Sequence, residues 1–374
     1  MALELPGLDA VPVRPVALQG FLPEELSALC RACGQAAFRG KQLWQWLQQR
    51  GARGWGEMTN IPKVLAAALE AAGCTASPLE VAAASGETEG GTRKLLGRLV
   101  DGECVETVVL PSKGRQLTVC VSTEVGCKMG CAFCASGKGG FARRLSAGEI
   151  VAQVGAAGRE AGLRPDHVVF MGMGEPFDNY DEVLRAVRVL NHPEGLGIGA
   201  RKLTLSTSGV VPGIRRLAEE GLQVELSVSL HAADPETRRR LMPVERKWPM
   251  AELLAACAAY TRKTKRIVTF EYTLIRGVND RSQDVAALAE KLRLFPCRVN
   301  LIPLSPVAEF DGEAPPPERC EAFLDSLARR GIPGTLRRSR GKGVDAACGQ
   351  LRRRFAAKAE KEFDGKDRIS ENQT

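Results

Sequence analysis

The stretch that decides the fold is Gly126-Cys-Lys-Met-Gly-Cys-Ala-Phe-Cys134. Its cysteines, Cys127, Cys131 and Cys134, follow a C-x3-C-x2-C spacing, which suits a loop that holds three irons of a cubane. The fourth iron then has no protein ligand and can chelate a small molecule through amino and carboxylate groups. Zinc would need a fourth cysteine or histidine close by, and the next candidates are scattered along the chain. We therefore predict one 4Fe-4S cluster on these three thiolates.

A repeating pattern of apolar strands and amphipathic helices follows this loop. Strands are expected at 117–123, 167–172, 202–208, 224–230, 268–275 and 299–304. Helices are expected between them, at 147–162, 180–191, 214–220, 250–264 and 284–295. Strands separated by helices pair in parallel, and ligands then bind at the C-terminal ends of the strands. The sequence thus predicts an α/β fold, a partial (β/α)6 barrel whose first strand leads into the cysteine loop.

The rest of the chain divides into shorter parts. We expect a helical accessory domain at 1–90, a β-strand extension at 91–116, the barrel at 117–340 and a tail at 341–374. Tryptophans in the first part stand among lysines and arginines. They could form the core of a small helical domain, or they could stack on RNA bases while the cations hold phosphates.

The composition narrows the class of protein. The 374 residues are 44% hydrophobic and 26% charged, as in an ordinary globular protein. No run of about 18 apolar residues is present, and the N-terminus lacks a basic stretch that leads into an apolar one. We therefore expect a cytoplasmic protein without a membrane segment. In that setting the 12 cysteines favour metal ligation or redox catalysis, and the net charge of +8 is compatible with a polyanionic partner.

Polar residues stand where the expected strands end. Met171-Gly-Met-Gly-Glu-Pro176 follows the second strand, and its glycines allow the backbone to approach a ligand closely. This stretch resembles the GGEP-like element of radical S-adenosylmethionine (SAM) enzymes, which implies that Gly174 and Glu175 contact the methionyl amine. The ends of later strands add further candidates for the SAM pocket, namely Ser206, Ser229, Leu230, His231 and Ser305.

Nearly the full chain resembles the RlmN/Cfr family of radical SAM RNA adenine methyltransferases. Most of the diagnostic value lies in the C-terminal stretch, because few other radical SAM enzymes carry a lone cysteine such as Cys348 there. The matching stretches are Phe38-Arg-Gly-Lys-Gln42, Glu57-Met-Thr-Asn-Ile61, Gly91-Thr-Arg-Lys94, Val105-Glu-Thr-Val108, the segment 120–134, Ala147-Gly-Glu-Ile150, Gly172-Met-Gly-Glu-Pro176, Ser206-Thr-Ser-Gly209, Ser229-Leu-His-Ala232, Asn300-Leu-Ile-Pro303 and Asp345-Ala-Ala-Cys-Gly-Gln350.

The resemblance implies a mechanism that uses two SAM molecules per turnover. Cys348 would take a methyl group from the first SAM, which requires a thiolate. A radical formed from the second SAM would activate this S-methyl group for addition to an adenine carbon. Cys120 would then form a disulfide bond with Cys348 to release the product, and Glu106 would accept a proton. The basic run Arg337-Arg338-Ser-Arg340-Gly-Lys342 favours a reactive thiol, because cations lower a thiol pKa and hold phosphates; a solvated tail is the alternative role of these cations.

The resemblance also implies the substrate and the partners. These are carbon 2 of adenine 2503 in 23S rRNA, with adenine 37 of tRNA as an open second target, and an electron donor such as flavodoxin for a monomeric enzyme. Methylation of carbon 8, or a radical SAM reaction on another substrate, stays open as an alternative. A glycyl-radical activase or an enzyme with an auxiliary cluster would need further closely spaced cysteines. A non-catalytic iron–sulfur or zinc RNA-binding module would leave the residues at the strand ends without a role.

Overall fold

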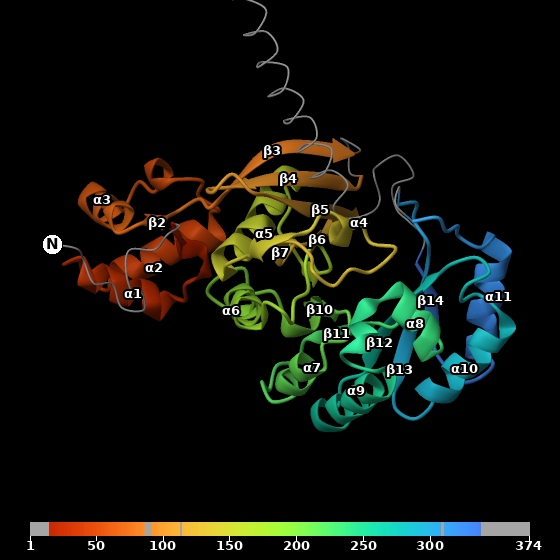
Figure 1. The fold of residues 1–374 in the computed structure, drawn as a ribbon. Coiled ribbons are helices and arrows are strands. Elements are labelled where there is room, and N and C mark those ends of the chain that lie inside the picture. Colours follow the sequence, from red (N-terminus) through yellow and green to blue (C-terminus); the bar gives the residue numbers. More distant parts are fainter. Residues whose placement is uncertain (1–14, 87–90, 113, 308–309, 338–374) are drawn as a thin grey trace, which may run out of the picture.

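A ten-stranded mixed sheet forms the centre of the chain (Figure 1). The computed structural model describes residues 15–86, 91–112, 114–307 and 310–337. The strand order is β14-β13-β12-β11-β10-β9-β6-β5-β4-β3. From β6 to β14 every neighbouring pair is parallel, whereas β3, β4, β5 and β6 pair in an antiparallel manner.

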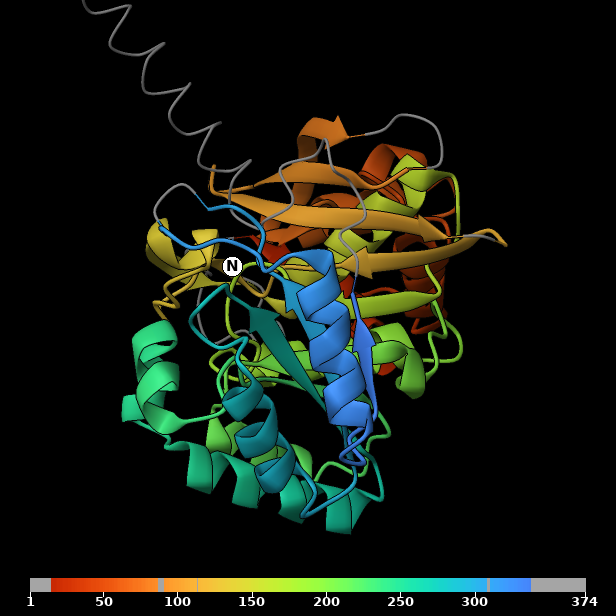
Figure 2. The ribbon, with the colours of Figure 1, turned by 90° about the vertical axis from the view of Figure 1, so that its right-hand side faces the viewer.

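The parallel part is the expected partial barrel, with helices between successive strands (Figure 2). A seventh parallel strand, β14, extends the six that the sequence predicts. The parallel strands are β6 (Gln116–Cys120), β9 (His167–Phe170), β10 (Leu203–Thr207), β11 (Glu225–Ser229), β12 (Val268–Leu274), β13 (Cys297–Pro303) and β14 (Gly334–Leu336). The helices are α5 (Ala147–Ala161), α6 (Tyr180–Asn191), α7 (Val211–Leu217), α8 (Pro235–Leu241), α9 (Met250–Thr264), α10 (Ser282–Leu292) and α11 (Pro317–Ala328).

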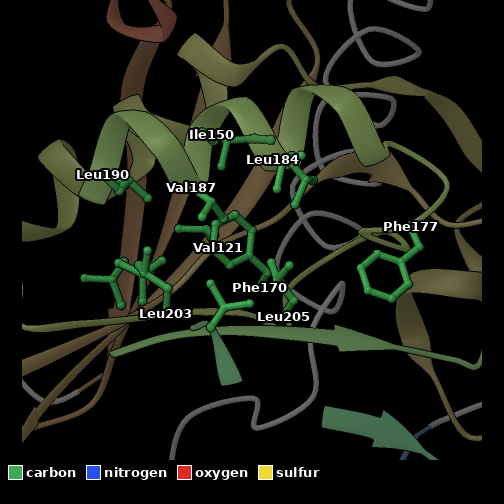
Figure 3. Packing of buried hydrophobic residues seen from close by; sticks show 14 of the residues in the cluster. Val121, Ile150, Phe170, Phe177, Leu184, Val187, Leu190, Leu203 and Leu205 are labelled. Atoms are coloured by element: carbon green, nitrogen blue, oxygen red, sulfur yellow. The ribbon is translucent and has the colours of Figure 1, made fainter. Parts of the chain in front are cut away.

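Apolar side chains on alternate strand positions pack beneath the helices. Figure 3 shows Phe170 of β9 and Leu205 of β10 directed towards Val187 of α6 and Ile150 of α5. Successive side chains of a strand point to opposite faces, so Ser206 lies on the face away from these helices. The helices therefore cover one face of the parallel strands with a dry core, and the polar positions are left for the inner face.

The local sequence determines where helix α5 begins and ends. Ser146 caps it, because its hydroxyl accepts a hydrogen bond from the backbone of Glu149, whose carboxylate accepts one from the backbone of Ser146 in return. The helix ends at Gly162, which adopts a left-handed conformation with φ of 60°. These signals set where α5, the helix after β8 (Phe141–Arg144), begins and ends.

The N-terminal part forms a helical domain beside an antiparallel extension of the sheet (Figure 1). Trp44 is fully buried, and its Nε1 donates to the carbonyl of Glu194 at 2.7 Å, so this tryptophan belongs to the core. Strand β3 was not among the expected elements, and it lies within residues 1–90, the range expected to form the helical accessory domain. The elements are α1 (Pro23–Ala32), α2 (Phe38–Trp44), α3 (Lys63–Ala71), a small sheet of β1 (Val16–Ala17) and β2 (Cys74–Thr75), and the extension strands β3 (Leu79–Gly86), β4 (Arg93–Leu99) and β5 (Cys104–Ser112).

None of the helices in the described part of the chain is long and apolar enough to cross a membrane. The segment that precedes α1 docks closely on α5. A Cβ atom on Gly148 would lie 2.4 Å from the Cβ of Ala17 and 2.5 Å from its carbonyl oxygen. Only glycine permits this approach of two backbones, and the approach holds the N-terminal part against the barrel.

We expect Gly148→Ala to lower the free energy of unfolding by about 1–3 kcal/mol, because the added methyl group overpacks this contact. Gly155→Ala in the same helix is the control, since the nearest atom to its added methyl group is Arg159 Nη1 at 3.5 Å. The control should be neutral or stabilise the protein by up to about 1 kcal/mol, because alanine favours the helix. Chemical denaturation of both variants measures the difference, and equal effects would contradict the docking role of Gly148.

Candidate cluster and cofactor site

The cysteine loop is held between two short strands, β7 (Glu124–Gly126) and β8 (Phe141–Arg144). The backbone N–H of Cys127 donates to the carbonyl of Gly140 at 2.9 Å. Burial raises the pKa of Cys127 to about 12, with a contribution from Cys134. It raises the pKa of Cys131 as well, with contributions from Cys134 and Cys127. The three cysteines are half-buried on one loop, and thiols with raised pKa values ionise when they bind a cationic metal centre.

Two further contacts fix the loop on the barrel. The backbone N–H of Ala132 donates to the carbonyl of Leu241 at the end of α8, at 2.9 Å. The ring of Phe133 packs edge-on against the ring of His231, with 4.8 Å between the centroids. Lys128, which follows the first cysteine, lies 2.6 Å from a carboxylate oxygen of Asp178. The loop is therefore held from the α8 side, from the end of β11 and from the segment after β9.

The Gly174–Glu175 element follows β9 and contacts the segment that follows β10. Gly174 has a φ of 103°, and a Cβ atom there would lie 2.6 Å from the Cβ of Glu124, so only glycine fits. The buried Glu175 carboxylate accepts hydrogen bonds from the backbone N–H groups of Ser208, at 2.7 Å, and Phe177, at 3.0 Å. Its side chain is thus directed at the backbone, and it locks two of the expected pocket segments together.

His231 follows β11 in a left-handed conformation, with φ of 55°. Its Nδ1 accepts a hydrogen bond from the backbone N–H of Thr273 at 2.9 Å, and its carbonyl accepts one from the side chain of Asn279 at 2.8 Å. Burial lowers its pKa to about 3, and Arg238 adds to this shift. His231 is therefore a neutral imidazole whose proton is on Nε2.

The other predicted pocket residues lie along the same edge of the sheet. Ser229 is the last residue of β11, and the buried Leu230 follows it and donates its backbone N–H to the carbonyl of Glu271 at 3.0 Å. Ser206 is half-buried in β10. Ser305 is half-buried two residues after β13. Because the strands are parallel neighbours, their C-terminal ends gather these side chains at one edge.

Cys120 and Glu106 come together on one face of the sheet. Cys120 pairs with Val108, and Glu106 stands two residues before Val108 in β5, so the two side chains project from the same face. Glu106 is buried, and one of its carboxylate oxygens lies 3.3 Å from Nζ of Lys94. Cys348, Arg338 and Arg340 lie outside the described residues.

Two charged residues at this edge were not among the predicted site residues. Glu124 is buried, and one of its oxygens accepts a hydrogen bond from the backbone N–H of Glu175 at 3.0 Å. Burial is the main cause that raises its pKa to about 8, and the nearby carboxylates of Asp178 and Glu175 contribute to the same shift. Arg238 of α8 is also fully buried. A charge that directly follows an apolar strand was the sequence signal for Glu124, since such a position is rarely charged without a partner.

These features fit a small cationic ligand beside a metal cluster. An ammonium group bound beside Glu124 would favour the charged form of this carboxyl and would lower its raised pKa. The nearby thiols suit iron, which prefers thiolate ligands.

Comparison with known proteins gives the family. Residues 121–289 match the Radical SAM superfamily, and residues 16–74 match the ribosomal RNA large subunit methyltransferase N-terminal domain. A protein of Symbiobacterium thermophilum, described as a probable dual-specificity RNA methyltransferase RlmN, is 50% identical over 345 residues, which cover 91% of this chain and 92% of that protein. This chain belongs to the RlmN family of radical SAM methyltransferases.

Further relatives agree with this assignment. The dual-specificity RNA methyltransferase RlmN of Sorangium cellulosum is 44% identical over 382 residues, covering 92% of this chain and 96% of that protein. The crystal structure of a radical SAM methyltransferase from Sphaerobacter thermophilus superposes with a TM-score of 0.86 at 46% identity, covering 90% of this chain and 99% of that one. Membership of the radical SAM superfamily implies a 4Fe-4S cluster and SAM, and the thiols and carboxylates described above fit both.

The raised pKa of Glu124 predicts a pH-dependent stability difference. The unfolded carboxyl has a pKa near 4.5 and the folded one about 8, so the native state keeps the proton in between. The stability that this group contributes is present at acid pH and is lost as the pH rises from about 4.5 to 8. Glu124→Gln, which mimics the neutral acid, should gain stability relative to the parent protein over this interval, by at most about 1.4 kcal/mol per pH unit.

Denaturant titrations of the cluster-free protein at several pH values measure this gain. Glu290→Gln is the control, because it makes the same chemical change at an exposed position outside the site. A Glu124→Gln difference that is constant with pH would show that the carboxyl is already ionised near pH 5.

Proposed function

We propose that this enzyme methylates carbon 2 of adenine in RNA, with adenine 2503 of 23S rRNA and adenine 37 of tRNA as its targets. It acts in the cytoplasm as a monomer and takes electrons from a donor such as flavodoxin. The observation that carries the proposal is the common edge on which the cysteine loop, the polar strand ends and Cys120 lie. The relatives' description as dual-specificity RNA methyltransferases supports RNA as the substrate.

We propose that Cys127, Cys131 and Cys134 hold the cluster. The residues proposed to contact SAM are Gly174, Glu175, Ser206, Ser229, Leu230, His231 and Ser305, and two SAM molecules are used per turnover. When bound, the cluster and SAM supply the one-electron chemistry that an unreactive aromatic carbon requires. Within the chain, Glu175 holds two strand ends in register, and Phe133 and His231 form a packed aromatic contact beside the loop.

Cys348 is proposed to carry the methyl group as S-methylcysteine, and Cys120 to release the product. The thiolate of Cys120 attacks the sulfur of Cys348 and forms a disulfide bond. The bond between that sulfur and the transferred carbon breaks, and the carbon keeps the electron pair and takes a proton to complete the methyl group. Glu106 lies on the same face as Cys120 and serves as the proton acceptor in the preceding step, with the Lys94 ammonium beside it.

Anaerobically reconstituted protein should contain about four irons per chain, the content of one cubane. Alanine at Cys127, Cys131 or Cys134 should remove the cluster, because three protein ligands are the minimum in this site. Cys33→Ala, in the N-terminal helical domain, is the matched control and should keep the iron. Iron analysis and visible absorbance give the result, and an intact cluster in any of the three loop variants would refute the ligand assignment.

Cys120→Ala should form the carbon–carbon bond to adenine and then stall, because no second thiol is available to attack Cys348. The expected product is protein linked covalently to RNA, visible as a shifted band on a denaturing gel. The double variant Cys120→Ala/Cys348→Ala should give no such band. Mass spectrometry of nucleosides from RNA treated with the parent enzyme distinguishes 2-methyladenosine from 8-methyladenosine. Normal turnover by Cys120→Ala would overturn the proposed release step.

A further inference from the structure

A buried ion pair joins two strands beside the proposed release thiol. Nζ of Lys94, in β4, lies 3.3 Å from a carboxylate oxygen of Glu106, in β5, and only 3% and 1% of the two side chains are exposed. Lys94 pairs with Val108 in the sheet, and Val108 pairs with Cys120 of β6. Residues that pair across strands share a face, and so do residues two positions apart. Lys94, Glu106 and Cys120 therefore project from the same face.

The opposite face of these strands is turned towards α5. Arg93, which precedes Lys94, forms an ion pair with Glu160 of α5. Successive side chains of a strand point to opposite faces, so the ammonium of Lys94 lies on the face away from this helix. Strand β4 thus uses one cation to hold α5 on the sheet and the next one to reach Glu106.

Stability does not account for the pair of Lys94 and Glu106. Removing two charges from water is costly, and replacement of a buried ion pair by apolar side chains is often neutral or stabilising. This face accepts apolar side chains, since Leu96, which pairs with Glu106 in the sheet, is fully buried. A charged pair in these surroundings is better explained by a task that requires a charge.

The backbone of Glu106 is connected to the proposed SAM pocket. Ser122, two residues after β6, donates its hydroxyl to the carbonyl of Glu106 at 2.6 Å. The same hydroxyl accepts a hydrogen bond from the backbone N–H of Met173 at 3.0 Å. Met173 directly precedes Gly174, so a single serine links Glu106 to the element that is proposed to contact SAM. The buried pair therefore lies beside the proposed site.

We propose that Lys94 is a positioning residue for the proton transfer to Glu106, an inference that rests on the proposed role of Glu106 as the proton acceptor. A methyl group replaces the hydrogen of the target carbon, so this hydrogen leaves as a proton. Its C–H bond breaks, the electron pair stays with the ring, and an O–H bond to Glu106 forms.

The ammonium of Lys94 prepares Glu106 for this step. Burial alone favours the neutral acid, which cannot accept a proton. A cation beside the carboxyl favours the charged carboxylate, and the attraction is strong because little water is present to screen it. Lys94 thus holds Glu106 in the form that can react and fixes the direction of its carboxylate.

The test compares charge variants of Lys94 in the full-length reconstituted enzyme, with methylated adenosine measured by mass spectrometry of RNA nucleosides. In Lys94→Met the kcat should fall at least tenfold, within the roughly 10²–10⁴-fold that a general base contributes. The KM for RNA should not change, because the pair acts on the reaction step and not on binding. Lys94→Arg keeps the charge and should recover most of the rate. Iron content and S-methylation of Cys348 should match the parent enzyme, since both precede the proton transfer.

The variant Glu106→Gln decides whether Lys94 acts through Glu106. Addition of Lys94→Met to Glu106→Gln should cause no further loss of rate, because the carboxylate that Lys94 holds is already absent. A further loss as large as that of Lys94→Met alone would overturn the inference. Loss of Cys348 methylation in Lys94→Met would overturn it too, because Lys94 would then act on an earlier step. Lys94→Gln, which keeps a hydrogen-bond donor without the charge, takes the place of Lys94→Met if that variant does not retain iron.

The matched control is Arg98→Met, which removes an exposed cation of the same strand that pairs with Glu80 at 3.1 Å. Its kcat and KM should equal those of the parent enzyme. A parent-like kcat in Lys94→Met would contradict the role of Lys94. Normal turnover by Glu106→Gln would instead refute the proposed proton acceptor, and a parent enzyme that makes no methylated adenosine would refute the proposed function.

Discussion

The parallel ladder of hydrogen bonds from β6 to β13 is the constraint on which the site depends. Strands that pair in parallel run in the same direction, so all of their C-terminal ends meet at one edge. Residues separated by almost 200 positions, from Cys120 to Ser305, are gathered at that edge although each lies on a different strand or loop. The outer face can be sealed by helices because apolar side chains alternate with the polar ones that the inner face needs.

Burial of charge is the second feature of this edge. Glu124, Glu175, His231 and Arg238 are all almost completely removed from solvent, and each is held by backbone hydrogen bonds. Burying such groups costs free energy unless they find partners, and here the backbone at the strand ends supplies most of them. The raised pKa values of Glu124 and Cys127 reflect the part of this cost that a bound cation and a metal centre would relieve. Preorganised polar groups of this kind are typical of sites that perform chemistry.

Much of the fold follows from the sequence, because six apolar runs separated by helical patterns allow few other arrangements. The cysteine spacing and the Gly174–Glu175 element could also be recognised in the sequence, because each of these motifs consists of residues only a few positions apart. Strand β14 escaped notice because it has three residues, too few for an alternating pattern. Arg238 was equally hidden. Its contacts are with Ser208 and Ser229 on two other elements, and a run of three arginines in the sequence reads as a solvated surface.

The antiparallel extension connects the residues of the proposed thiol chemistry to the barrel. Strand β6 is shared, since it pairs with β9 on its barrel side and with β5 on the other. The register of β5 against β6 therefore decides whether Glu106 and Cys120 share a face. A slip of one residue would turn one of the two side chains towards α5, where Thr107 now donates to Gln153 at 3.0 Å. Gln153 also accepts from the backbone N–H of Ser122, two residues after β6, at 2.8 Å, so the same side chain that stabilises the helix on the sheet holds this register.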